Sequence, residues 1–217
     1  MEAAGKELCG QIVHCFKRLY EQGTINLFEG NISARAGDTI LMTPSQQNKE
    51  TMTPEMIVAL GSDGRLLADH GYRPSSEARM HLEIYRLRPD LGAVVHTHSA
   101  FATAFALAGQ PIRGELAEIY MFYGGEIPCC AYGAPGTDAV FAEFERYFVG
   151  EGKDVVLIGN HGLVAAGRDL EEAFSRAEAV EKLAKTVLLA RQLGGEKPLP
   201  AGAAEELLAR WKAGRTR

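Results

Sequence analysis

Residues 94–99, VVHTHS, place two histidines one residue apart at the end of an apolar run. The run 93–97 has the composition of a buried β-strand, in which residues two apart point to the same face of a sheet. His96 and His98 therefore present two imidazole rings side by side, a spacing that suits one divalent ion. By itself, the pattern is more simply explained by two polar residues on an exposed strand face.

A third histidine favours the metal site. The stretch DVVLIGNHG, residues 154–162, ends another apolar strand with His161 in a turn rich in Gly and Asn. Loops after strand ends are common places for binding and catalytic residues. Three histidines with one open position are typical of catalytic zinc, whereas structural zinc usually has four ligands. His14 and His81 on helices and His70 in a polar loop are better explained as ordinary structural or surface residues.

A candidate carboxylate lies in RPSSEARMH, residues 73–81. Ser75 and Ser76 stand at the expected start of a helix, where free backbone N–H groups and the helix dipole favour an anion. Glu77 follows them directly. Taken alone, the segment is more simply explained as a serine cap with an acidic first-turn residue. EGNIS, residues 29–33, has the same ambiguity between a plain turn and a loop that approaches a ligand.

Helical and extended patterns alternate along the rest of the chain. The apolar spacing predicts helices at 8–20, 76–87, 99–108, 169–193 and 203–212, with Asp169 as the cap of the fourth. It predicts strands at 93–97, 125–130, 154–159 and 163–166, and hairpins within 31–43 and 56–67. Because tight turns join several neighbouring strands, we expect a mixed sheet with hairpins, covered by helices.

Composition narrows the classes of protein. The 217 residues are 46% hydrophobic and 24% charged, which suits one domain spanning 1–217. The net charge of −5 argues against a nucleic-acid partner. No apolar run approaches the roughly 18 residues of a membrane span, and no secretion signal is evident. With no CxxC pair among the four cysteines, we expect a cytoplasmic protein with no membrane partner.

Five short motifs occur in the order typical of one superfamily: Gly30-Asn31-Ile32-Ser33, Thr43-Pro44-Ser45, Ser75-Ser76-Glu77, His96-Thr97-His98 and Asn160-His161-Gly162. Together they resemble the class II aldolase/adducin superfamily, and the resemblance runs from the first helix to the last. It implies an α/β fold, a three-layer α/β/α sandwich with a central mixed, largely antiparallel sheet covered by helices.

The resemblance also implies roles. The zinc ligands would be His96, His98 and His161, with one Zn²⁺ per subunit and another divalent metal ion as the alternative, and Glu77 would be the acid/base carboxylate. The residues that bind substrate or its phosphate would be Gly30, Asn31, Thr43, Ser45, Ser75 and Ser76. A tyrosine would serve as the second acid, for which Tyr120 is preferred and Tyr123 is the alternative. The partners implied are a sugar phosphate and further copies of the chain, in a homotetramer with active sites at subunit interfaces.

Some positions depart from the fuculose-phosphate aldolases of this superfamily. Gln46 stands where those enzymes usually carry glycine, and Phe28 stands where they have a threonine. Near the C-terminus the only aromatic residue is Trp211, where a tyrosine is expected, although Arg215 or Arg217 could reach an anionic substrate. These differences leave the substrate open.

We therefore expect a zinc-dependent aldolase that cleaves a ketose 1-phosphate, of the fuculose phosphate or 5-deoxypentulose phosphate type. The products would be dihydroxyacetone phosphate and an aldehyde, formed through a metal-stabilised enediolate. A sugar-phosphate 4-epimerase, a methylthioribulose-1-phosphate dehydratase and a decarboxylase remain alternatives on the same scaffold. Glu77 in place of aspartate, and the lack of a histidine after His161, disfavour the epimerase. The intact histidines disfavour a non-catalytic, adducin-like interaction domain.

Overall fold

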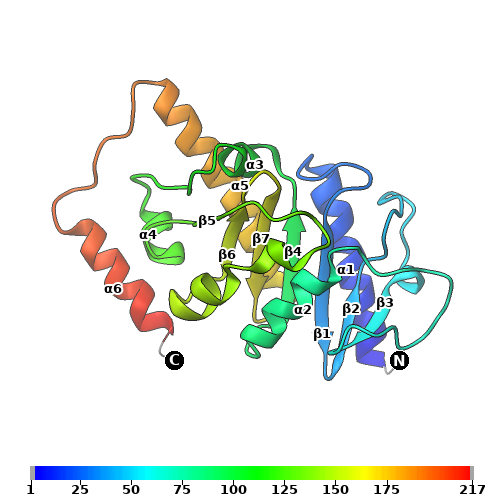
Figure 1. The fold of residues 1–217 in the computed structure, drawn as a ribbon. Helices are drawn as coiled ribbons and strands as arrows, with labels where there is room; N and C mark the ends of the chain where they lie inside the picture. Colours follow the sequence, from blue (N-terminus) through cyan, green and yellow to red (C-terminus); the bar gives the residue numbers. More distant parts are fainter. Residues whose placement is uncertain (1–2, 216–217) are drawn as a thin grey trace.

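A seven-stranded sheet forms the central layer of the molecule in the computed structural model, which describes residues 3–215 (Figure 1). Its strands are β1 (Asn31–Ala36), β2 (Thr39–Met42), β3 (Val58–Gly61), β4 (Ala93–Thr97), β5 (Cys129–Cys130), β6 (Val155–Ile158) and β7 (Gly162–Gly167). The strand order is β3-β2-β1-β4-β7-β6-β5. Every neighbouring pair is antiparallel except β5 and β6, so the sheet is mixed and largely antiparallel, as expected.

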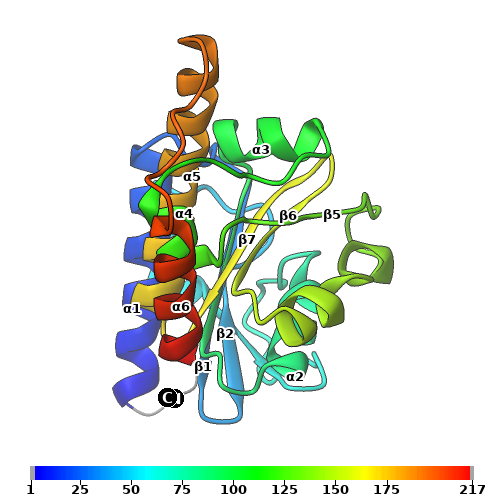
Figure 2. The same cartoon turned by 90° about the vertical axis from the view of Figure 1, so that its left-hand side faces the viewer.

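Helices cover both faces of this sheet. They are α1 (Ala3–Glu21), α2 (Ala78–Leu87), α3 (Ala100–Leu107), α4 (Ala117–Tyr123), α5 (Leu170–Gln192) and α6 (Ala203–Arg215), with the short 3₁₀ helices η1 (Pro54–Met56) and η2 (Asp138–Phe141) and the π-helix η3 (Glu145–Gly150). Figure 2 shows α1, α4, α5 and α6 on one side of the sheet and α2 on the other. The three-layer α/β/α sandwich is therefore confirmed.

Side-chain alternation in β4 connects both cores to the candidate site. Ala93 and Val95 pack in the apolar cluster on the α1 and α5 side, and Val94 packs in the cluster on the α2 side. Since neighbouring strand residues point to opposite faces, His96 faces the same side as Val94. The central strand thus directs its histidine toward α2, at whose N-terminus Glu77 lies.

Two expectations about secondary structure were wrong in part. After the turn at 61–64 the chain makes only an isolated bridge between Leu60 and Leu66, so the hairpin within 56–67 has one regular strand. The expected strand at 125–130 shortens to Cys129–Cys130, and a helix, α4, precedes it. Gly124 ends that helix with a φ of 64°, a left-handed conformation typical of a helix C-terminus.

The expected cap of the long helix α5 is confirmed. Asp169 Oδ1 accepts a hydrogen bond of 2.8 Å from the backbone N–H of Glu172. The carboxylate of Glu172 accepts from the N–H of Arg168, one residue before the cap, so the reciprocal bond of a standard capping box is displaced. None of the helices within residues 3–215 is long and apolar enough to cross a lipid bilayer.

Candidate metal centre

Four side chains that are distant in sequence converge where β4 ends: Glu77, His96, His98 and His161. Their ligand atoms, one from each residue, all lie within 4.8 Å of one another. The three imidazole rings have centroid separations of 4.8, 4.8 and 4.9 Å and are tilted by 68 to 73° to one another. The structure therefore brings together the three histidines and the carboxylate that the sequence analysis singled out.

The pairing of β7 with β4 places His161 next to the other two histidines. β7 pairs with β4, and His161 lies in the tight turn that joins β6 to β7. Asn160 in this turn has a φ of 54°, a left-handed conformation that asparagine tolerates. A Cβ atom on Gly162 would lie 2.5 Å from the Thr97 carbonyl oxygen, so only glycine lets the turn approach β4 this closely.

Hydrogen bonding and burial set the state of two of the three rings. His96 Nδ1 lies 2.9 Å from the Leu163 carbonyl oxygen. Because a carbonyl oxygen only accepts, Nδ1 donates to it and Nε2 faces the cluster. Burial, with the nearby His96 and His161, lowers the pKa of His98 to about 3, so the His98 ring is neutral. A neutral imidazole is the form that binds a metal ion.

Glu77 directly precedes α2, and its carboxylate reaches into the cluster. Oε2 lies 3.3 Å from His96 Nε2, and Oε1 lies 3.1 Å from His161 Nε2. Burial acts to raise the pKa of Glu77, but His96 and His161 outweigh it and lower the pKa, so the carboxylate is ionised. Oε1 is nevertheless buried without a hydrogen-bond partner.

This donor set fits a divalent cation. Three imidazoles and one carboxylate meet at a single point, and the unpaired Glu77 Oε1 lacks the partner that a cation would supply. Histidine nitrogens with a carboxylate oxygen are donors that zinc and similar transition metals accept. The described residues thus contain a group that could bind a metal ion.

Two loops lie side by side near the N-terminus of α2. Pro44 and Pro74 form an isolated antiparallel bridge, and the N–H of Ser45 donates to the Arg73 carbonyl oxygen at 2.8 Å. The next residue, Gln46, has a φ of 54°. A left-handed conformation costs a residue with a Cβ about 1–2 kcal/mol. The backbone at Gln46 therefore has the conformation that favours glycine.

Ser75, Ser76 and Gly30 border the cluster. Ser75 Oγ accepts a hydrogen bond of 3.2 Å from the N–H of Glu77, which ties the serine loop to the carboxylate. Ser76 is exposed at the start of α2, where an anion is favoured. Gly30 has a φ of 72°, and a Cβ there would lie 2.8 Å from the His96 carbonyl oxygen. Glycine at 30 is thus required for the turn before β1 to pack against β4.

Thr43 does not fit its expected role. Its side chain is fully buried, and its hydroxyl accepts a hydrogen bond of 3.1 Å from the backbone N–H of Ile32. Thr43 N also donates to the Ile32 carbonyl oxygen at 3.0 Å. The hydroxyl therefore extends the pairing of β1 with β2 and is not free to bind a phosphate oxygen.

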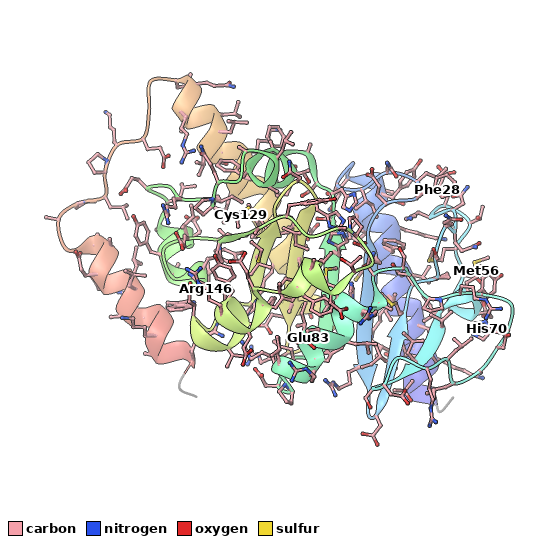
Figure 3. The ribbon with its side chains drawn as sticks, viewed as in Figure 1. Phe28, Met56, His70, Glu83, Cys129 and Arg146 are labelled. Carbon is pink, nitrogen blue, oxygen red and sulfur yellow. The ribbon has the colours of Figure 1, made fainter. Side chains whose placement is uncertain are left out.

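The tyrosine candidates lie on α4, away from the cluster within this chain. The Tyr120 hydroxyl donates to Glu115 Oε1 at 3.3 Å, and Tyr123 is buried in the core. Phe28, labelled in Figure 3, lies on the loop between α1 and β1, and its side chain is 58% exposed to solvent. Within residues 3–215 the Tyr120 hydroxyl is therefore bonded to Glu115 and not to a side chain of the cluster.

The C-terminal helix is fastened to the body of the molecule. The Trp211 ring packs on Gly124, where a Cβ atom would come within 2.8 Å of it. Arg215 forms an ion pair of 2.8 Å with Asp154. Within this chain Arg215 is therefore engaged in a structural contact. That Arg215 or Arg217 could reach an anionic substrate stays a prediction, and Arg217 lies outside the described residues.

The comparisons with known proteins agree with this geometry. The family model described as Class II Aldolase and Adducin N-terminal domain matches residues 10–188. The chain belongs to the class II aldolase/adducin family. It is 38% identical over 185 residues to a 5-methylthioribulose-1-phosphate/5-deoxyribulose-1-phosphate aldolase of Rhodospirillum rubrum, covering 84% of this chain and 81% of that protein. It is 32% identical over 201 residues to an L-fuculose phosphate aldolase of Escherichia coli, covering 93% and 91%.

A solved structure of an L-fuculose 1-phosphate aldolase matches the whole architecture. It superposes on the present chain with a TM-score of 0.85 at 27% sequence identity, covering 95% of the present chain and 96% of the solved one. The expected family and the expectation of a class II aldolase enzyme are confirmed by these matches.

His81 is a residue of the site that the sequence analysis left aside. It is fully buried on α2, with Nε2 2.6 Å from Asn31 Oδ1 and Nδ1 2.7 Å from Ser33 Oγ. Asn31 in turn donates to Glu77 Oε2 at 2.8 Å. Glu77 and His81 are four residues apart, a spacing that places both on one face of a helix, and this spacing was the available signal.

Proposed function

We propose that this protein is a zinc-dependent aldolase that cleaves a ketose 1-phosphate to dihydroxyacetone phosphate and an aldehyde. The observation that carries the proposal is the cluster of three histidines with Glu77, beside a helix N-terminus and two adjoining loops. The aldolase names of the relatives from Rhodospirillum rubrum and Escherichia coli support the same reaction class.

The proposed reaction breaks the bond between C3 and C4 of the sugar. The electron pair stays on C3, the C4 hydroxyl loses its proton to become the aldehyde, and C3 takes up a proton. When bound by His96, His98 and His161, a zinc ion supplies Lewis-acid stabilisation of negative charge on substrate oxygens. Glu77, ionised and with Oε1 free of hydrogen bonds, is placed to carry the proton at C3.

The phosphate would be held by the groups that border the cluster. Ser75, Ser76 and Ser45 offer hydroxyl donors near the N-terminus of α2, which favours an anion. Gly30 approaches from the turn before β1. Asn31 does not fit its expected role in phosphate binding, because its amide is buried and bonded to Glu77 and His81. Anchoring the phosphate at a distance from the reacting carbon fixes the sugar's orientation, which is a large part of catalysis in such sites.

Tyr120 would protonate the aldehyde oxygen in the condensation direction, acting from a neighbouring copy in a homotetramer. Its helix, α4, carries Phe122, which is 59% exposed, and large exposed apolar side chains are typical of subunit contacts. Light scattering on the purified protein measures the mass of the assembly. A monomer with full activity would remove Tyr120 from the site.

A 5-deoxypentulose 1-phosphate is the substrate we favour. Phe28 and Gln46 both depart from the fuculose-phosphate aldolase pattern, and the relative from Rhodospirillum rubrum is named for 5-deoxyribulose 1-phosphate and its 5-methylthio analogue. The shorter sugar would release acetaldehyde, whereas fuculose phosphate would release a hydroxylated aldehyde. Substrate choice therefore depends on how the site receives the end of the sugar that lacks phosphate.

The decisive test assays protein purified without chelators on a panel of ketose 1-phosphates, with metal analysis of the same sample. The proposal predicts about one zinc per chain and release of dihydroxyacetone phosphate, most rapidly from 5-deoxyribulose 1-phosphate. Epimerisation, loss of water or loss of carbon dioxide, without dihydroxyacetone phosphate, would identify one of the alternative activities.

A further inference from the structure

A stripe of polar residues on α2 faces a stripe of polar residues on β1. Glu77, His81 and Tyr85 are spaced four residues apart, so they follow one face of the helix at intervals of about 6 Å. Asn31 and Ser33 are two apart on one face of the strand, an interval of about 7 Å. Because these intervals nearly match, each strand residue fits between two helix residues.

The contacts form an unbroken chain. Asn31 Nδ2 donates to Glu77 Oε2 at 2.8 Å, and Asn31 Oδ1 lies 2.6 Å from His81 Nε2. His81 Nδ1 lies 2.7 Å from Ser33 Oγ, which lies 2.8 Å from the Tyr85 hydroxyl. Asn31, Ser33, His81 and Tyr85 are each at most 4% exposed. A buried chain of this kind is stable only when every donor has an acceptor.

The donors can be assigned in one direction. Asn31 Nδ2 donates to Glu77 Oε2, so the amide turns its oxygen toward His81 Nε2. His81 must then donate from Nε2 and accept at Nδ1. The Ser33 hydroxyl donates its one proton to His81 Nδ1, so Ser33 Oγ accepts a hydrogen bond from the Tyr85 hydroxyl. Each group is satisfied once, and the Tyr85 hydroxyl closes the chain at its far end.

Both titratable groups of the chain keep the form that this assignment requires. Burial, with the nearby His96, lowers the pKa of His81 to about 3, so its ring is neutral. Burial raises the pKa of Tyr85, so the phenol keeps its proton. Arg35 lies over the Tyr85 ring at 4.9 Å and donates to the Tyr85 carbonyl oxygen at 3.3 Å, which holds the end of the stripe in place.

We propose that His81, backed by Ser33 and Tyr85, is a positioning residue that holds the Asn31 amide in the orientation that keeps Glu77 at the metal centre. Without the N–H of His81, the Asn31 amide can turn over and present its oxygen to the carboxylate, which then loses its donor. The inference rests on the proposed role of Glu77 as proton carrier, and it assigns a function to three residues that touch neither metal nor substrate.

The test compares His81→Leu, which removes both nitrogens, with His81→Gln, which keeps an amide N–H near the position of Nε2. His81→Leu is expected to lower kcat by about 10- to 100-fold, the usual cost of removing a supporting hydrogen bond. KM and zinc content are expected to stay unchanged, and His81→Gln is expected to recover most of kcat. Tyr85→Phe, farther along the chain, is expected to have a smaller effect.

Ile84→Val, a trimmed core residue on the same helix, is the matched control: it should lower thermal stability and leave kcat unchanged. Equal damage from His81→Gln and His81→Leu, a fall in zinc content, or a kcat that follows stability in every variant would overturn the proposal. Any of these results would instead assign His81 a role in packing or in metal binding.

A measurement on the unaltered protein keeps the inference testable if His81→Leu does not fold. Nitrogen-15 NMR of histidine is expected to show His81 with a protonated Nε2 and a bare Nδ1. The opposite tautomer or a doubly protonated ring would overturn the chain. Because this spectrum needs no substrate, it separates failure of the positioning role from failure of the aldolase assignment, which would show as absence of turnover in the unaltered protein.

Discussion

At the scale of single residues, the charge states around the metal centre decide what it can do. His96 Nδ1 donates to the Leu163 carbonyl oxygen, so Nε2 faces the cluster. Glu77 brings the single negative charge among four converging groups. Histidines bind a metal as neutral imidazoles, so three of them would leave the charge of a bound dication largely uncompensated, which strengthens its effect on an anionic transition state.

Glu77→Gln separates metal binding from proton transfer. The amide preserves the shape of the side chain and removes its ability to carry a proton. Zinc content is expected to stay near that of the unaltered protein, while kcat falls by about 10²- to 10⁴-fold, the rate acceleration that general acid–base catalysis typically supplies. Turnover within twofold of the unaltered protein would exclude Glu77 as proton carrier.

His98→Ala removes one of the three proposed ligands. The expected result is loss of bound zinc and of activity, measured by elemental analysis after dialysis and by release of dihydroxyacetone phosphate. His70→Ala is the matched control, because His70 lies in a distant exposed loop and its loss should leave zinc content unchanged. Full zinc occupancy in His98→Ala would remove this residue from the ligand set.

At the scale of elements, turns and caps set the positions of the site loops. The long helix α5 packs against β4 and β7, the strands that carry or adjoin the histidines. Its start is defined by the Asp169 cap. The loop at Gln46, in contrast, adopts a left-handed conformation with a residue that has a Cβ atom.

Asp169→Ala is expected to lower the free energy of unfolding by about 1 kcal/mol, the usual cost of losing a side-chain N-cap. Urea unfolding monitored by circular dichroism measures it. Glu171→Ala removes an exposed acidic group from the same helical turn without a cap bond, so it should cost less. Equal losses from the two variants would mean that charge near the helix start, and not the cap, sets the stability.

Gln46→Gly is expected to raise the free energy of unfolding by about 1 kcal/mol, because glycine adopts the left-handed conformation without steric cost. The same substitution removes a side chain next to the proposed phosphate loop. We expect KM for the sugar phosphate to fall while kcat changes little. A less stable Gln46→Gly variant would show that the Gln46 side chain makes a compensating contact.

At the scale of the whole molecule, one carboxylate joins three helices. Asp154, directly before β6, has a side chain only 11% exposed and pairs with Arg88 after α2, Arg176 on α5 and Arg215 on α6 at 2.8 to 3.1 Å. Burial acts to raise the pKa of Asp154, but the hydrogen bond and charge of Arg215, with the other two guanidinium groups, lower it below its usual 3.8. This contact fastens the C-terminal helix to the sandwich.

The sign of the pH effect follows from that lowered pKa. Asp154 contributes its full stabilisation above pH 3.8, the ordinary pKa, and loses it as pH falls further through the lowered folded-state value. Asp154→Asn should therefore lower stability near pH 7, by about 3 kcal/mol, and should flatten the loss of stability below pH 4. Urea unfolding at pH 3 to 7 measures both. A parallel pH dependence in the two proteins would show that other carboxylates dominate.

The sequence by itself determined the local features. Period-two spacing in a strand aligned His96 with His98, because it depends on residues close together in the chain. The linear order of five short motifs indicated the family. Only the tertiary structure decided which distant groups meet. It placed His161 beside the other histidines through the pairing of β7 with β4 and joined His81 to Glu77 through Asn31. It engaged Arg215 with Asp154 and the Thr43 hydroxyl with β1. These contacts depend on which strand pairs with which and which helix covers it, and that choice is made by the packing of the whole core.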